Sequence, residues 1–137
     1  MIAFRKLALA FAVALILSPL APASLAAKSM SEAERSALQA AMVQHIDRQS
    51  IDGLYLHIDL SDGRVVEFAP AKSHPMMFRL GEHFVLCTEF KDSRGGAVNV
   101  DFYVTRAGKS FAVFRAEIDN RAPLMKLMAQ GKVSAVD

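Results

Sequence analysis

The sequence predicts an α+β domain in which a long N-terminal helix packs on an antiparallel meander of about five strands, followed by a short C-terminal helix. Two patterns predict this fold class. Apolar residues recur with helical spacing up to about residue 50, and from Leu54 onward they alternate with a period of two. Turns that contain glycine separate the alternating segments, so neighbouring strands are expected to run antiparallel.

The chain has 137 residues, and residues 1–27 have the layout of a secretory signal peptide. Arg5 and Lys6 precede an unbroken apolar stretch at 7–17, and small residues fill 24–27. As a helix this stretch would rise only about 16 Å, roughly half of a bilayer's hydrocarbon core, so it is too short to span comfortably. The Ala-rich leader predicts a Sec-type signal and a periplasmic or secreted bacterial protein.

Cleavage would leave one domain at 28–137, with fourteen Lys and Arg residues against fourteen Asp and Glu residues. This balance predicts that the protein binds neither nucleic acid nor an anionic membrane surface, because either partner needs an excess or a cluster of basic residues. A lipid anchor would need a cysteine at the cleavage point, and the single cysteine is Cys87. Since one cysteine cannot form an intramolecular disulfide, we expect a buried, inert thiol within the apolar run 84–87.

The first helix is predicted to begin at Ser31, because Ser31 and Glu34 have the spacing of a capping box. Gly53 is expected to end it. His45 falls within the apolar stripe and is expected to be a packed, hydrogen-bonded, neutral imidazole rather than a ligand. The stripe consists of Leu38, Ala41, Met42 and Ile46.

The first hairpin is predicted from residues 54–60, where every even position is aliphatic, and from the returning segment 64–69. A three-residue loop at 61–63 matches apolar with apolar side chains and polar with polar side chains. This register sets Ile58 opposite Val66, Leu56 opposite Phe68 and His57 opposite Glu67. Leu56, Leu86 and Phe102 are then expected to share one apolar layer beneath Leu38.

Pro70 and Pro75 bracket a segment that is predicted to be an irregular link, because proline cannot donate to a strand ladder. Three further strands are predicted at 83–91, 97–105 and 110–118. With Lys91 opposite Ala97, the facing pairs are Leu86 with Phe102, Phe84 with Val104, Cys87 with Asp101 and Val85 with Tyr103.

The last strand is predicted to pair through Arg106 and Lys109, which puts Phe111 and Val113 on the dry face of the sheet. Ala112, Phe114, Ala116 and Ile118 would then make the other, mixed face substantially apolar. We expect the terminal helix, a small ligand or another copy of the protein to cover part of that face. The terminal helix is predicted to open at Asn120, to present Leu124, Leu127 and Met128, and to close at Gly131.

This order of elements, with an Asp62-Gly63 turn and a Gly95-Gly96 turn, resembles the cystatin-like superfold and its nuclear-transport-factor-like branch of small exported bacterial proteins. The resemblance is one of layout over residues 31–128. The Gln-x-Val-x-Gly loop of inhibitory cystatins is absent, because the corresponding turn reads Ser-Asp-Gly-Arg at 61–64. Enzymes with this fold bind small molecules between sheet and helices, and the corresponding residues here are Tyr55, His57, Asp59, Asp101 and Tyr103.

Acid–base chemistry is one candidate activity, with His57, Asp101 and Tyr103 as candidate catalytic residues. A buried Asp101 would need a partner for its charge or would stay neutral. Arg115 is expected to point to the opposite face, which excludes it as that partner. The alternative is that Asp101 is a solvated or hydrogen-bonded structural residue, and we favour this alternative.

Copper binding is a weaker candidate, because His74, Met76 and Met77 cluster beside Pro75 and because thioether and imidazole ligands suit Cu(I). The alternative is that these methionines fill gaps in the core. The spacing of zinc ligands, the glycine pattern of a phosphate loop and the G-x-S-x-G motif are all absent, so no cofactor is expected.

The sequence therefore favours a non-enzymatic exported domain that binds a small molecule or a protein, including a second copy, through the mixed sheet face. The predicted binding residues are Tyr55, Val85, Cys87 and Phe114. A small cavity enzyme and a periplasmic copper-binding protein are the alternatives.

Overall fold

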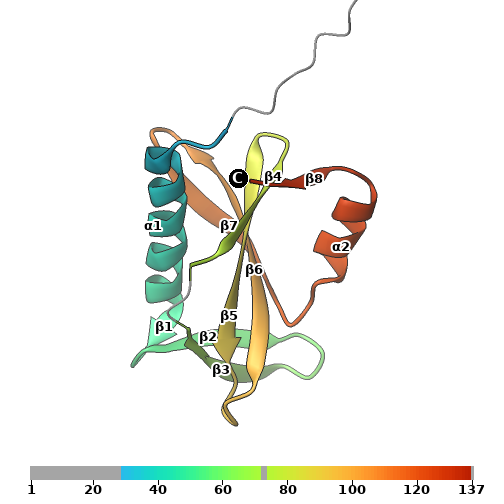
Figure 1. Cartoon of the computed structure of the whole chain (residues 1–137). Helices are drawn as coiled ribbons and strands as arrows, with labels where there is room; N and C mark the ends of the chain where they lie inside the picture. The colour runs from blue at the N-terminus through green and yellow to red at the C-terminus, as the bar shows by residue number, and fades with distance from the viewer. Residues whose placement is uncertain (1–28, 72–73, 137) are drawn as a thin grey trace, which may run out of the picture.

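The computed structural model describes residues 29–71 and 74–136, so the predicted signal peptide lies outside the described residues. The predicted α+β class is confirmed: α1 lies on one side of an antiparallel sheet and the short α2 on the other (Figure 1). The elements are α1 (Glu32–Gln49), β1 (Ser50–Ile51), β2 (Leu54–Asp59), β3 (Arg64–Pro70), β4 (Met76–Leu80), β5 (His83–Lys91), β6 (Ala97–Ala107), β7 (Ser110–Ile118), α2 (Ala122–Ala129) and β8 (Val133–Ala135).

The sheet of the described residues has eight strands rather than about five. The three strands that the sequence did not predict are β1, β4 and β8. Each is short, and β8 exists only because it pairs with β4. Strands this short carry too few residues for their alternation to be recognised.

The two central strands, β5 and β6, pair in the predicted register, from Lys91 opposite Ala97 to Phe84 opposite Val104. Their even-numbered side chains face α1 and form the main core. The residues at its centre are fully buried: Leu38, Phe84, Leu86, Phe90, Val100, Phe102 and Val104.

The N-terminus of α1 begins where the capping pattern predicts it, because the Ser31 hydroxyl accepts a hydrogen bond from the Glu34 amide at 3.1 Å. The Glu34 carboxylate forms an ion pair with Arg106 of β6. The guanidinium of Arg106 also lies over the ring of Phe111, 4.9 Å from its centroid. The start of the helix is thereby attached to the sheet.

His45 is packed and hydrogen-bonded, as the sequence predicts. Its Nε2 lies 3.2 Å from the Tyr55 hydroxyl, and its ring meets Phe102 edge-on with centroids 5.5 Å apart. Burial lowers the pKa of His45, and the nearby Arg48 lowers it further. These shifts favour the neutral imidazole at the interface between the helix and the sheet.

The predicted register of the first hairpin is wrong by one residue. Tyr55 pairs with Phe68 and Ile58 with Val65, so four residues, 60–63, form the turn. Asp59 shapes this turn: its side chain accepts hydrogen bonds from the amide and the hydroxyl of Ser61 at 2.9 and 2.6 Å.

This shift reverses the faces of β2, because side chains alternate along a strand, while Val66 and Phe68 of β3 stay on the predicted core side. Tyr55 takes the place expected for Leu56 in the core, opposite Phe68, and its ring meets that of Phe90 edge-on at 5.3 Å. Burying the Tyr55 ring removes a larger side chain from water than burying Leu56 would. Leu56 therefore does not share the layer of Leu86 and Phe102, and this part of the expected core is incorrect.

The predicted register of β7 is also wrong, because Ala107 pairs with Ser110 and a bulge follows at Phe114. Before the bulge, Phe111 and Val113 face the core, as expected. After it, Ala116 and Ile118 also face the core instead of the mixed face. Arg115 and Glu117 occupy the opposite face in their place.

That second face carries its own small core, in which Leu124 of α2 and Val133 of β8 cover Val85, Cys87 and Tyr103. The sequence left three possible covers for this face: the terminal helix, a small ligand or another copy of the protein. In the structure the terminal helix covers it. The helix begins at Ala122, with Arg121 instead of Asn120 at the N-cap. Partly buried residues complete the cluster: Phe78, Leu80, Leu127 and Met128.

The cover ends before the first hairpin, which extends across the bottom of the sheet (Figure 1). Ile51, Ile58 and Val65 remain exposed there, with 62%, 50% and 64% of their surface accessible. Pairing across the strands sets them on one side, together with Leu54 and Leu56, which are partly buried. We call these five side chains the outer hairpin face.

Replacing Leu124 with alanine should destabilise the protein by roughly 2 to 5 kcal/mol, because the side chain is almost fully buried over the second face. Denaturant unfolding measures the change. Met125→Ala is the matched control on the same helix, since Met125 is 58% exposed, and it should change stability by less than about 0.5 kcal/mol. Equal effects of the two substitutions would contradict the cover by α2.

Candidate functional site

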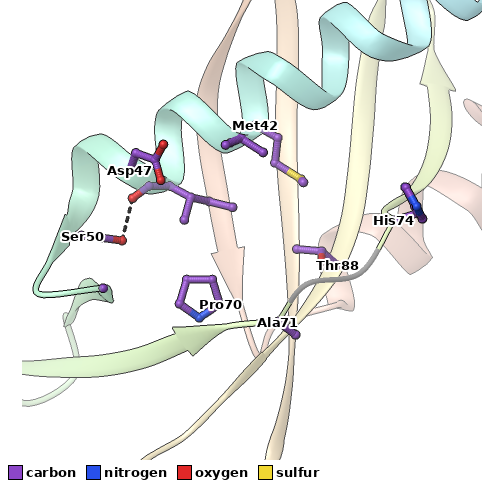
Figure 2. A pocket seen from close by; sticks show the side chains of 10 residues that line it. Met42, Asp47, Ser50, Pro70, Ala71, His74 and Thr88 are labelled. Carbon is purple, nitrogen blue, oxygen red and sulfur yellow. Dashed lines mark hydrogen bonds between the residues drawn. The ribbon is translucent and has the colours of Figure 1, made fainter.

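A pocket of about 590 Å³ lies where the last turns of α1 pass over the link between β3 and β4 (Figure 2). Met42 extends from the helix toward the sheet, and Thr88 of β5 and Pro70 lie below it. Most of the wall is apolar, which suits the body of a small organic ligand. The lining residues are Met42, Val43, Ile46, Asp47, Ser50, Gly53, Pro70, Ala71, His74 and Thr88.

The pocket exists because β5 changes its neighbour at this point. Pro70 of β3 pairs with Phe90, and Met76 of β4 pairs with Cys87, so Thr88 lies between the two pairings. The chain turns away from the β5 ladder between Ala71 and Met76, and the irregular link predicted from the two prolines accounts for this departure. Thr88 therefore lies between the two ladders, just past the hydrogen bond that the Ala71 amide donates to the Glu89 carbonyl at 3.2 Å.

A second, smaller pocket of about 260 Å³ adjoins the first and shares Ala71, His74 and Thr88 with it. Because Cys87, Glu89 and Asn99 line it, this pocket lies on the opposite face of the sheet, the face that α2 partly covers. The remaining lining residues are Met76 and Arg121. The two pockets together combine an apolar chamber with a polar one.

Asp101 lies buried behind the polar pocket, with only 1% of its surface exposed. The partner of its carboxylate is Arg121, whose Nη2 lies 3.4 Å from Oδ1. The thiol of Cys87 also forms a hydrogen bond with Asp101. Burial raises the pKa of the Cys87 thiol, and the adjacent Asp101 raises it further, so the thiol stays protonated.

No pattern in the sequence marks Arg121 as a partner of Asp101, because Arg121 follows β7 in a connection without periodicity. Arg115, which we had excluded as a partner of Asp101, does reach the face of Asp101 after the bulge, but it pairs with Glu117. The Nε of Arg121 is buried and makes no hydrogen bond within the part of the chain that the structure describes. A buried donor without an acceptor is rare, and it commonly marks a place that a water or ligand fills.

The three candidate catalytic residues do not converge. Asp101 and Tyr103 share the face below α2, whereas His57 lies on the core side of β2, together with Tyr55. His57 lines a separate groove of about 950 Å³ between the first hairpin and β7. The geometry therefore brings together the Asp and the Tyr without the His.

Tyr103 is itself buried, and its hydroxyl has no hydrogen-bond partner among the described residues. Burial raises the pKa of Tyr103, and the neighbouring Asp101 raises it further. Its ring packs 6.4 Å from that of Phe114. A phenol with a raised pKa is poorly suited to serve as a base near neutral pH.

The predicted binding residues do not form one surface. Tyr55 lies in the main core, and Val85 and Cys87 lie in the second core beneath α2. Only Phe114 is exposed, at the β7 bulge, where its ring meets that of His83. The face that was predicted to bind a partner is instead filled by the protein's own C-terminal segment.

The predicted copper ligands also diverge. Met76 is exposed on the side of Cys87, while Met77 is buried in the main core, where its sulfur accepts a long contact of 4.0 Å from Arg35. His74 lines the two adjoining pockets. Among residues 29–71 and 74–136, no group of three or more His, Cys, Asp or Glu side chains could hold a metal ion.

No protein-family model matches this chain, and searches among curated proteins and solved structures found no significant match. The cystatin-like resemblance therefore stays a prediction from the layout of the elements. None of the helices within the described residues is long and apolar enough to cross a membrane. The pockets and surfaces of the chain itself are therefore the basis for inferring a function.

The Cys87 thiol should react at least a hundredfold more slowly with iodoacetamide in the folded protein than after unfolding, a factor of about 10² typical of a strongly disfavoured thiolate. Mass spectrometry of the alkylated protein near neutral pH measures this. The assay is unambiguous because Cys87 is the only cysteine of the chain. Rapid alkylation under native conditions would contradict the buried position of the thiol.

Proposed function

We propose that this protein is an exported binding domain that holds a small, largely apolar molecule in the pocket beside the C-terminal half of α1. The observation that carries the proposal is the lining of that pocket. Its volume of about 590 Å³ falls within the range of small-molecule sites, and Met42, Val43, Ile46 and Pro70 make much of its wall. Asp47, Ser50, His74 and Thr88 supply a few polar groups that could orient the ligand.

Binding is preferred to catalysis because the groups suited to acid–base chemistry are separated or buried. Asp101 is paired with Arg121, and His57 belongs to another groove. A general base must come within hydrogen-bond reach of the bound substrate. The copper alternative is not proposed, since Met76 and Met77 point to opposite faces of the sheet.

The neutral fluorophore N-phenyl-1-naphthylamine should bind the wild-type protein and gain fluorescence in the apolar pocket. Val43→Trp should weaken binding about tenfold or more, because the indole would occupy the chamber that Val43 lines. A fluorescence titration gives the dissociation constants.

Gln44→Trp is the control, since Gln44 is an exposed neighbour on α1 that does not line the pocket. This variant should bind the fluorophore as the wild type does. Absence of binding to the wild-type protein would overturn the proposal, and equal weakening by both tryptophans would show that the fluorophore binds elsewhere.

A second proposal concerns the outer hairpin face, which we assign to contact with a second copy of the chain. Ile58 pairs with Val65 across the hairpin, and Ile51 and Leu54 continue the apolar surface. The even-numbered aliphatic residues of β2, which were predicted to be buried, thus lie on the outer side of the hairpin. Contiguous apolar surface of this kind usually marks an interface.

The charges around the outer hairpin face favour a self-complementary contact. Glu67 pairs with Leu56 on this face, and Lys91 lies beside Ala69 on the same side. A two-fold axis between the two charged residues would set Glu67 of each copy opposite the partner's Lys91. The fourteen acidic and fourteen basic residues of the domain leave no net charge to oppose the association.

Val65→Lys should convert the dimer to a monomer, because it would place a charge within the apolar contact. Sedimentation equilibrium measures the change. Met125→Lys introduces the same charge at an exposed apolar position on α2 and should leave the dimer intact.

Glu67→Lys should weaken the dimer, because it would place two lysines opposite each other. Adding Lys91→Glu to this variant should restore the dimer. A wild-type protein that is monomeric throughout the concentration range would overturn this proposal.

A further inference from the structure

We infer that the free edge of β7 binds an extended segment of another polypeptide, which enters the groove of about 950 Å³ between the first hairpin and β7 as an added strand. This groove shares no lining residue with the pocket beside α1, so the inference does not depend on the proposed function. Three features of the groove carry it: unpaired backbone groups of β7, an apolar floor and the charges at the rim.

Strand β7 forms one edge of the sheet, because it pairs only with β6. Just past its end, the Asp119 amide donates a hydrogen bond to the Asn99 carbonyl at 2.8 Å. Bonded pairs alternate along an antiparallel ladder, so Glu117 also turns its backbone groups toward β6, whereas Ala116 and Ile118 turn theirs away. Outside the strand ladders, the residues that the structure describes show no hydrogen bond to the backbone of Ala116 or Ile118. Their N–H donors and C=O acceptors therefore lie along an open edge.

The groove follows this edge. Every residue from 115 to 120 lines it, although neighbouring side chains of a strand point to opposite faces, so the groove meets β7 at its edge rather than at one face. The floor consists of apolar side chains of the main core and its border: Val66, Phe68, Val98, Ala116 and Ile118.

An extended polypeptide matches both features. Its backbone offers a donor and an acceptor at every second residue, which is the spacing of the free groups of Ala116 and Ile118. Its side chains alternate, so every second one would turn toward the apolar floor. We therefore expect a bound segment with apolar residues at alternate positions.

The charges around the groove favour a basic residue in that segment. Arg115 and Glu117 form an ion pair with each other. The carboxylate of Asp119 is exposed and has no hydrogen bond or ion pair within the described residues, so it is free to pair with a Lys or Arg of the segment. Arg94 opposes such a residue, although its charge is offset by that of Asp92. Four carboxylates and three guanidiniums line the groove: Asp59, Asp92, Glu117, Asp119, Arg64, Arg94 and Arg115.

Selection of random linear peptides displayed on phage against the purified protein tests the inference, because a library does not presuppose a sequence. The enriched peptides should share alternating apolar residues and a basic residue. Fluorescence polarisation of a labelled, enriched peptide gives its dissociation constant. Methylating its backbone amides one at a time should weaken binding about tenfold or more at every second position, where the amide faces β7, and by about twofold or less at the positions between.

Two variants test the protein side. Ala116→Pro removes an N–H that faces away from β6, a position at which an edge strand tolerates proline, and should weaken the peptide about tenfold. Asp119→Asn keeps a residue that tolerates the positive φ of 51° and removes the charge. It should weaken the basic peptide about twofold to fivefold and leave an analogue with glutamine at the basic position unchanged. Val43→Trp fills only the pocket beside α1 and is the control that should bind as the wild type does.

A selection that enriches no binder, or a methylation scan without alternation, would overturn the inference, and the scan needs no variant of the protein. Equal weakening by Val43→Trp would place the peptide in the pocket beside α1 and also overturn it. If the wild type sediments as a dimer and Ala116→Pro as a monomer, a second copy occupies the edge and the inference is wrong. The fluorophore titration of the pocket beside α1 is independent of all these outcomes.

Discussion

The pairing of β5 with β6 is the constraint on which the rest of the structure depends. Side chains on both faces of these strands are apolar: Leu86 and Phe102 on one, Val85 and Tyr103 on the other. A sheet of this kind must be covered on both sides. Helix α1 covers the first face through Leu38, Ala41 and Met42, and the C-terminal segment from α2 to β8 returns to cover the second. The short helix, unremarkable by itself, thus completes the fold.

The same constraint explains where the pockets lie. The covers have different lengths, and the neighbours of β5 change from β3 to β4 near Thr88. An apolar and a polar pocket lie near that point on the two sides of the sheet and share Ala71, His74 and Thr88 in their walls. A pocket at a change of neighbouring strands needs no special loop or motif, which is consistent with the absence of a recognisable signature in the sequence.

The buried polar cluster shows how packing and charge are combined. Asp101 lies opposite Cys87, as the strand register predicts, but the residue that compensates its charge comes from the connection after β7. The bulge at Phe114 makes this possible, because it reverses the faces of the residues that follow and sends Ala116 and Ile118 into the main core. One extra residue in an edge strand therefore decides both the composition of the core and the surroundings of Asp101.

The sequence by itself determined the α+β class, the start of α1 and the pairing of β5 with β6, because a capping pattern and a short glycine turn are local signals. It did not determine which side of β2 faces the core. The aliphatic side chains of β2 lie on one side and Tyr55 on the other, and the core side is set by the contacts of Tyr55 with Phe90 and Phe102. The bulge, the edge strands β4 and β8, and the approach of Arg121 to Asp101 depend on distant neighbours. Only the tertiary structure decided these features. The alternation of side chains along a segment shows that a strand has two faces, but it does not show which face other elements will cover.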